Sequence, residues 1–263
     1  MYLSNMSTPR TPLIAGNWKM NGTRAEACAW AEAAVAAAAE APNDAAIFPS
    51  APWLAKIAGL LHGSRVALGG QACAAESAGA FTGATSAAML AETGCSLVLC
   101  GHSERRHVFG ESDDYVAGSM AQALAAGLTP VLCVGETSEE RAAGRTQEVL
   151  LRQVDAGLAR LSSADQPLII AYEPVWAIGS GQPASPVEAA EAHGWIRARV
   201  AETDTERAAS VRILYGGSVN PDNIGRFLEV PDIDGALIGG AALDPKKFGA
   251  MVNASPASAP TGF

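Results

Sequence analysis

The amino-acid sequence predicts a (β/α)₈ barrel, an α/β fold of eight parallel strands in a single domain. Short apolar β-rich runs recur along the chain, stretches with helical periodicity lie between them, and 263 residues is an ordinary length for one such barrel. An open, doubly wound sheet is the alternative, because it needs the same alternation. No strand is followed by G-x-G-x-x-G, so a dinucleotide site has no support.

The eight runs are mostly apolar throughout, which is typical of parallel strands covered by helices on both faces. They lie at 12–18, 45–48, 66–70, 97–101, 130–134, 168–173, 212–216 and 235–240. Helical periodicity is found, among other stretches, at 24–40, 86–93, 113–126, 145–161 and 186–201.

Capping residues mark several helix starts. Two pairs have capping-box spacing, and two others place a capping side chain before a proline at the first helical position. These pairs are Thr23 with Glu26, Ser185 with Glu188, Asn220 with Pro221, and Asp244 with Pro245.

A chain of this size and composition can bury a large core, since 49% of residues are hydrophobic and only 17% are charged. Residues 1–263 form one domain, in which about 1–10 and 253–263 read as tails. No apolar run is long enough to span a membrane, and no signal peptide is evident. Five cysteines without a CxxC pair read as buried thiols, so we expect the cytoplasm.

The net charge of −9 argues against a nucleic-acid partner. A phosphate ligand must then be attracted by local groups such as a lysine, backbone N–H groups and helix N-termini. Chemistry in a barrel of this kind lies where strands end and loops begin. The polar and glycine residues at those positions are Asn17, Lys19, His102, Glu173, Ser218, Gly239 and Gly240.

Glu173 ends an apolar strand, where burial makes a carboxylate a stronger base and suits it to proton transfer from carbon. The alternative is a structural carboxylate that pairs with an arginine. The next residues, 174–181, combine a proline, apolar side chains and a Gly-Ser-Gly exit, which is the composition of a water-excluding lid. An ordinary loop is the alternative.

His102 follows the fourth strand, and Ser103 is a candidate cap for the helix that begins there. The positive end of a helix disfavours a protonated imidazole, so we expect a neutral ring that donates a hydrogen bond to a carbonyl oxygen. Lys19 offers a cation for a phosphate and for an enediolate oxygen, or is a solvated surface lysine. We interpret the other three histidines as structural: His62, His107 and His193.

Two glycine pairs, in "YGGSVN" (215–220) and "IGGAAL" (238–243), let the backbone approach a ligand and point N–H groups at it. Their places after the seventh and eighth strands match the usual phosphate site of these barrels. Each pair alone also marks a tight turn.

The segments "AGNWKMN" (15–21), "CGHSERR" (100–106), "AYEPVWAIGSG" (171–181) and the two glycine segments together resemble the triosephosphate isomerase family. The resemblance covers about 13–248 and includes "GAFTG" (79–83) and "CVGET" (133–137). It implies a TIM barrel that interconverts dihydroxyacetone phosphate and D-glyceraldehyde 3-phosphate in glycolysis and gluconeogenesis, with no metal or organic cofactor.

The resemblance also implies the residue roles. Glu173 matches the catalytic base and His102 the neutral electrophile, an assignment for which triosephosphate isomerase is itself the standard example. Lys19 and Asn17 match the electrostatic and substrate-binding pair. The phosphate-binding positions match Gly179, Ser218, Gly239 and Gly240. Ser103 and Glu104 match supporting positions, with Glu104 paired to Lys19.

The family is typically a homodimer, which the resemblance extends to this chain. Segment 71–83 matches the loop that inserts into the partner, where Thr82 lies near the partner's Asn17 and the partner's Lys19. A plain surface loop and a tetramer are the alternatives. The lid exit "GSGQPAS" (179–185) departs from the family pattern, because Gln182 and Pro183 stiffen it, and we expect a changed opening rate rather than lost function.

Two other functions fit the same fold. An isomerase of a related tetrose phosphate would keep Lys19, His102 and Glu173. A scaffold or binding protein without turnover would retain the barrel, although such drift removes catalytic side chains first, and all three are present. Cys133, near the predicted base, reads as a packing residue or as a redox-sensitive thiol.

Overall fold

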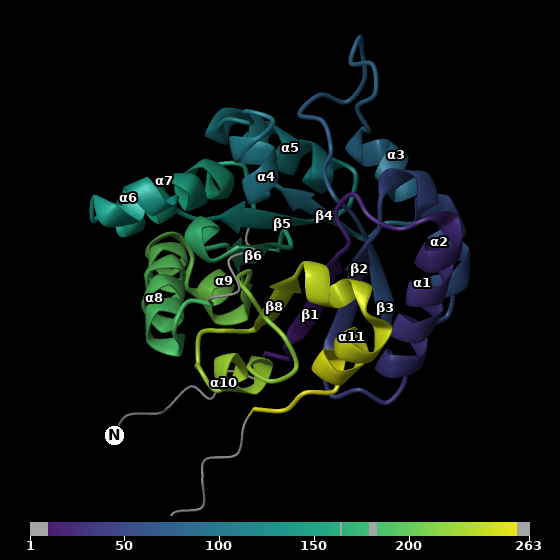
Figure 1. The fold of residues 1–263 in the computed structure, drawn as a ribbon. Coiled ribbons are helices and arrows are strands. Elements are labelled where there is room, and N and C mark those ends of the chain that lie inside the picture. Colours follow the sequence, from purple (N-terminus) through teal and green to yellow (C-terminus); the bar gives the residue numbers. More distant parts are fainter. Residues whose placement is uncertain (1–9, 164, 179–182, 257–263) are drawn as a thin grey trace, which may run out of the picture.

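The computed structural model describes residues 10–163, 165–178 and 183–256, which form a closed barrel of eight parallel strands (Figure 1). The strands pair in chain order, and β8 pairs with β1 to close the ring. The predicted (β/α)₈ barrel is confirmed, and the open sheet is wrong because the two terminal strands pair with each other. The strands are β1 Leu13–Asn17, β2 Asp44–Phe48, β3 Val66–Gly70, β4 Leu97–Cys100, β5 Thr129–Val134, β6 Ile169–Tyr172, β7 Arg212–Tyr215 and β8 Gly235–Ile238.

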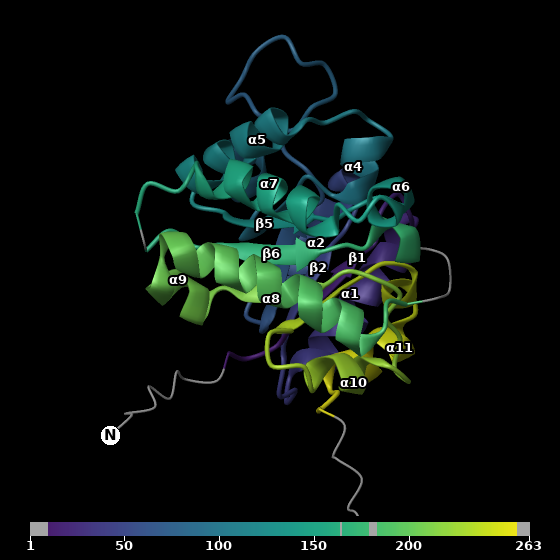
Figure 2. The ribbon, with the colours of Figure 1, turned by 90° about the vertical axis from the view of Figure 1, so that its left-hand side faces the viewer.

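The helices surround the barrel and cover the outer face of the strands (Figures 1 and 2). They are α1 Arg24–Ala38, α2 Leu54–Leu61, α3 Ala87–Glu92, α4 Ser103–His107, α5 Asp113–Ala125, α6 Ser138–Ala142, α7 Thr146–Leu158, α8 Pro186–Thr203, α9 Thr205–Ser210, α10 Ile224–Leu228 and α11 Pro245–Val252. Short 3₁₀ turns lie at Ala51–Trp53, Val175–Ala177 and Gly240–Leu243.

The strands are apolar over most of their length because both of their faces are buried. In β1, Leu13 and Ala15 belong to the cluster that fills the barrel, whereas Ile14 belongs to the cluster between the strands and the helices. Side chains alternate between the two faces of a strand, so neither face can carry an unpaired polar group at low cost. Polar side chains therefore gather at the strand ends.

Three of the four predicted capping pairs are confirmed. Thr23 and Ser185 form capping boxes with Glu26 and Glu188, and Asp244 caps α11. The prediction at Asn220 and Pro221 is wrong, because α10 begins at Ile224. The Asn220 Oδ1 atom instead accepts hydrogen bonds from the backbone N–H groups of residues 222 and 223, which closes a local turn.

The longest protrusion is the connection between β3 and α3, residues 71–86, which extends beyond the ring of helices in both views (Figures 1 and 2).

At the opposite end of the barrel, Arg10 forms an ion pair with Asp234 at 2.6 Å. Asn253 ends α11 and donates to the Ala37 carbonyl at 3.0 Å. Among the described helices, none is both long and apolar enough to cross a membrane.

Candidate active site

Alternate residues of each strand point into the barrel. The same alternation at the carboxyl ends of the strands brings polar side chains to one mouth of the barrel. Ala15 and Ala171 face the interior, and Asn17 and Glu173, two residues further along each chain segment, keep that direction. Both are buried, with 4% of Asn17 and 2% of Glu173 exposed. A carboxylate and an amide thus line the top of the barrel core.

The Glu173 carboxylate is held by two donors. Its Oε2 atom accepts from the Ser103 backbone N–H at 2.8 Å, and its Oε1 atom lies 3.1 Å from His102 Nε2. The Glu173 side chain fits there only because residue 216 is glycine: a Cβ atom on Gly216 would lie 2.7 Å from Glu173 Cγ. The surroundings fix the position of this carboxylate rather than leaving it to solvent.

The hydrogen bonds of His102 define its tautomer. His102 is the N-cap of α4, and its Nδ1 atom accepts from the Glu104 backbone N–H at 3.2 Å. An accepting Nδ1 carries a lone pair, so the proton of the neutral ring is on Nε2, which faces Glu173. The prediction that Ser103 caps this helix is wrong, since Ser103 is its first residue and the preceding imidazole occupies the capping position.

Lys19 has a strained backbone that its neighbours hold in place. Its φ of 51° is the one positive φ of a non-glycine residue in the described part of the chain, and such strain costs about 1–3 kcal/mol. Its N–H donates to Asn17 Oδ1 at 3.0 Å. Its carbonyl accepts from Ser50 Oγ at 2.9 Å and from Gln71 Nε2 at 2.8 Å. The ammonium group, 2.6 Å from Glu104 Oε1, is thereby aimed across the mouth.

These groups line a cavity of about 390 Å³ at the carboxyl ends of the strands. Its walls include the two glycine turns, at 216–220 and 239–241. The Lys19 side chain passes over one of them, because a Cβ atom on Gly239 would lie 3.4 Å from Lys19 Cε. A buried carboxylate, an imidazole, an ammonium group and two glycine turns thus surround one small volume.

Comparisons with known proteins identify the family of the chain. The family model of triosephosphate isomerase matches residues 12–255. The chain belongs to the triosephosphate isomerase family. It is similar to the triosephosphate isomerase of Herminiimonas arsenicoxydans, with 47% identity over 94% of this chain and 100% of the relative. It is also similar to that of Magnetococcus marinus, with 49% identity over 93% of this chain and 98% of the relative.

A solved structure of the family has the same fold. The crystal structure of triosephosphate isomerase from Bartonella henselae is 40% identical, and the match covers 91% of this chain and 97% of that one, with a TM-score of 0.84.

Most of the predicted site residues of this family member meet at one place. The cavity is lined by Asn17, Lys19, His102, Glu173, Ser218, Gly239 and Gly240. Ser103 and Glu104 contact Glu173 and Lys19 respectively. Gly179, Gln182 and part of the predicted lid lie outside the described residues. Thr82 is exposed on the protruding 71–86 connection and is not a wall of this cavity.

Sequence reasoning did not single out Tyr215, which supports the first glycine turn. Its hydroxyl accepts a hydrogen bond from the Ala184 backbone N–H at 2.9 Å, just before α8. Burial raises the pKa of Tyr215 to about 12, so the hydroxyl stays protonated. A Cβ atom on Gly217 would lie 2.1 Å from this hydroxyl, so glycine is required there. The "YGG" motif places this tyrosine directly before the two glycines, but by its sequence pattern alone the tyrosine is an ordinary strand residue.

Cys133 is fully buried inside the barrel. Burial and, secondly, the charge of Glu173 raise the pKa of its thiol well above the ordinary value. A thiol reacts through its thiolate, so this environment favours the packing interpretation.

The other buried histidine, His193 on α8, lies under the loop that precedes β8. Its Nδ1 atom is 3.1 Å from the Asp232 carbonyl, and its Nε2 atom has no protein partner in the described structure. Burial lowers the pKa of His193 to about 4. The folded state therefore holds a neutral ring, whereas the unfolded chain takes up a proton below its ordinary pKa of about 6.5.

We expect this histidine to weaken the fold in acid. Above about pH 6.5 the ring is neutral in both states and does not change the free energy of unfolding. As the pH drops towards 4, the free energy of unfolding falls by about 3 kcal/mol, because protons then bind His193 only in the unfolded state. Urea unfolding of His193→Gln and wild type between pH 7.5 and 4.5, at one protein concentration, measures the difference. The exposed His62→Gln is the control. Equal pH slopes for wild type and His193→Gln would contradict the prediction.

Proposed function

We propose that this protein interconverts dihydroxyacetone phosphate and D-glyceraldehyde 3-phosphate, with Glu173 as the base. One observation carries the proposal: the Glu173 carboxylate lies 3.1 Å from the donating His102 Nε2, in the cavity that also holds Lys19 and two glycine turns. Membership of the family supports a phosphorylated triose as the substrate. The reaction belongs to glycolysis and gluconeogenesis.

The proposed steps use these groups alone. Glu173 removes a proton from the carbon beside the carbonyl group, and the electron pair moves to the carbonyl oxygen to form a cis-enediolate. His102 Nε2–H and the Lys19 ammonium stabilise the negative oxygen as it develops. The hydroxyl proton of the first carbon moves to the former carbonyl oxygen, which lies beside it in the cis-enediolate. The protonated Glu173 then gives its proton to the former carbonyl carbon, and the new carbonyl group forms at the first carbon. Asn17 contributes by binding the Lys19 N–H and so setting the direction of the lysine.

The phosphate group fits the glycine turns. The Asn223 side chain donates to the Ser218 carbonyl at 3.0 Å and fixes the first turn, while Gly239 and Gly240 form the second. Backbone N–H groups of such turns bind an anion without a side-chain charge. Gly179, which the resemblance implies as a further phosphate-binding residue, lies outside the described residues.

A coupled assay with D-glyceraldehyde 3-phosphate and with D-erythrose 4-phosphate tests the substrate. We expect kcat/KM on the triose phosphate to approach the diffusional range of about 10⁸ M⁻¹s⁻¹, a limit for which triosephosphate isomerase is itself a standard example. A higher kcat/KM on the tetrose phosphate would favour the related isomerase. No turnover of either substrate would favour a scaffold protein.

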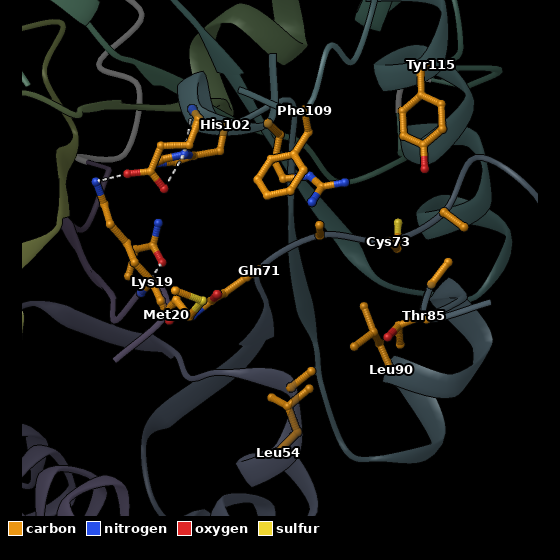
Figure 3. A pocket seen from close by; sticks show the side chains of 18 residues that line it. Lys19, Met20, Leu54, Gln71, Cys73, Thr85, Leu90, His102, Phe109 and Tyr115 are labelled. Atoms are coloured by element: carbon orange, nitrogen blue, oxygen red, sulfur yellow. Dashed lines mark hydrogen bonds and ion pairs between the residues drawn. The ribbon is translucent and has the colours of Figure 1, made fainter. Parts of the chain in front are cut away.

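We also propose that the protein acts as a homodimer in the cytoplasm. A second cavity of about 300 Å³ lies beside the first and shares Asn17, Lys19 and His102 with it. In Figure 3, Lys19 and His102 lie along one side of this cavity, and Cys73 and Thr85 along the other. Large apolar side chains are exposed at its rim, with Met20 94% and Phe109 65% exposed. Such a patch is typical of an interface.

The protruding 71–86 connection supplies a matching projection. It carries Phe81, 47% exposed, beside Thr82, and a second copy of this chain would present the same projection to the cavity of the first. The cavity borders Lys19, so an inserted loop would stiffen the site from outside. The five cysteines are free thiols, which supports a reducing compartment.

We expect Phe81→Glu to weaken the dimer about 100-fold or more, because a buried aromatic anchor contributes about 2–4 kcal/mol to an interface. Activity should fall with dissociation. Sedimentation velocity over a concentration series measures the dimer, with Val187→Glu, another exposed apolar side chain, as the control. A Phe81→Glu variant that remains dimeric at nanomolar concentration would refute the docking role of this loop.

A further inference from the structure

Arg141, on α6, contacts three side chains from separate parts of the chain. Its guanidinium carbon lies 4.3 Å from the centroid of the Trp176 ring. Its NH1 atom is 3.6 Å from Glu136 Oε1, and its NH2 atom donates to Glu188 Oε1. The positive charge of Arg141 therefore faces two carboxylates, and the flat face of its guanidinium group stacks on an indole ring. This arrangement suits a planar guanidinium.

The first of these contacts reaches the chain just after β6. Trp176, three residues beyond Glu173, donates from Nε1 to Glu136 Oε1 at 2.8 Å. Glu136 is fully buried and also accepts from the Tyr172 hydroxyl at 3.2 Å. Arg141 thus closes a cluster that fixes one described end of the connection between β6 and α8.

The second contact reaches the other end of the same connection. Glu188 Oε2 accepts from the Ser185 N–H at 2.8 Å in the capping box of α8, while Oε1 accepts from Arg141. Ser185 directly follows Ala184, whose N–H binds the Tyr215 hydroxyl at 2.9 Å. Tyr215 in turn lies under Gly217 in the first glycine turn. Arg141 is linked to that turn through Glu188, Ser185 and Ala184.

We propose that Arg141 is a positioning residue that holds the two described ends of the β6–α8 connection together and thereby keeps the phosphate-binding turn in register. It does not touch the cavity, and the inference rests on the proposed function. Its effect falls on the binding energy of the phosphate group, which an enzyme uses to lower the barrier at the reacting carbon. The base is largely independent of it, because Ser103 and His102 hold the Glu173 carboxylate.

Arg141→Gln and wild type are compared on D-glyceraldehyde 3-phosphate and on D-glyceraldehyde, which lacks the phosphate. We expect kcat/KM of the variant to fall about 10- to 100-fold on the phosphorylated substrate. On D-glyceraldehyde the fall should stay below about 3-fold. Arg141→Lys keeps the charge but loses the planar stack on Trp176, and it should recover part of the loss.

Arg145→Gln is the matched control, since Arg145 pairs only with the exposed Glu148 among the ion pairs of the described residues, at 3.7 Å. Equal losses on the two substrates, or an unchanged kcat/KM in Arg141→Gln, would overturn the inference. If Arg141→Gln does not fold, Arg141→Lys decides by the same two-substrate ratio. An inactive wild type would instead overturn the proposed function and leave the ratio undefined.

Discussion

Replacing Glu173 by glutamine should lower kcat/KM on D-glyceraldehyde 3-phosphate by about 10³-fold or more, because the amide cannot accept the proton from carbon. The site should otherwise persist, since a glutamine of the same length still accepts one of the two hydrogen bonds that Ser103 and His102 offer. Steady-state kinetics with a purified variant measures the loss, and circular dichroism verifies the fold.

Two further variants sharpen this result. Glu173→Asp keeps the charge but withdraws it by one methylene group, and it should show a smaller loss, of about 10²-fold, from misplacement of the base. Glu148→Gln, on an exposed surface of α7, is the control. If Glu173→Gln retained more than a tenth of wild-type activity, another group would have to be the base.

Replacing Lys19 by methionine should lower kcat/KM about 10²- to 10³-fold, because the proposed mechanism uses this cation to stabilise the developing enediolate and to attract the phosphate. The ammonium lies 2.6 Å from Glu104 Oε1, so the variant also leaves this half-exposed carboxylate unpaired at the mouth of the cavity. Both effects disfavour an anionic substrate, and we expect KM to rise and kcat to fall together.

Lys56→Met, on the exposed face of α2, is the control for a lost surface charge. The loss in Lys19→Met should shrink as the ionic strength of the assay increases, because salt screens the attraction that wild type retains. A variant with normal KM for the triose phosphate would show that Lys19 does not contact the phosphate.

The sequence by itself determined the barrel, because its signals are local and repeated. Runs that are apolar on both faces can be stable only between a core and a layer of helices, and eight of them in alternation leave few arrangements. Capping boxes such as Thr23 with Glu26 span one helical turn, so four consecutive residues contain the whole interaction. The strand-end positions of Lys19, His102 and Glu173 follow from the same alternation.

Only the tertiary structure decided how those side chains are held. The φ of Lys19 depends on Gln71, which is 52 residues away, and Arg141 binds a glutamate 47 residues away. Local pattern contains no information about such pairs, because they exist only once strand ends from different parts of the chain meet at one mouth. The same reason explains one error at a helix start, because the His102 ring, which caps α4, also lies beside Glu173 from a distant part of the chain. The error at Asn220 is local, because its side chain closes a turn and the next helix begins only at Ile224.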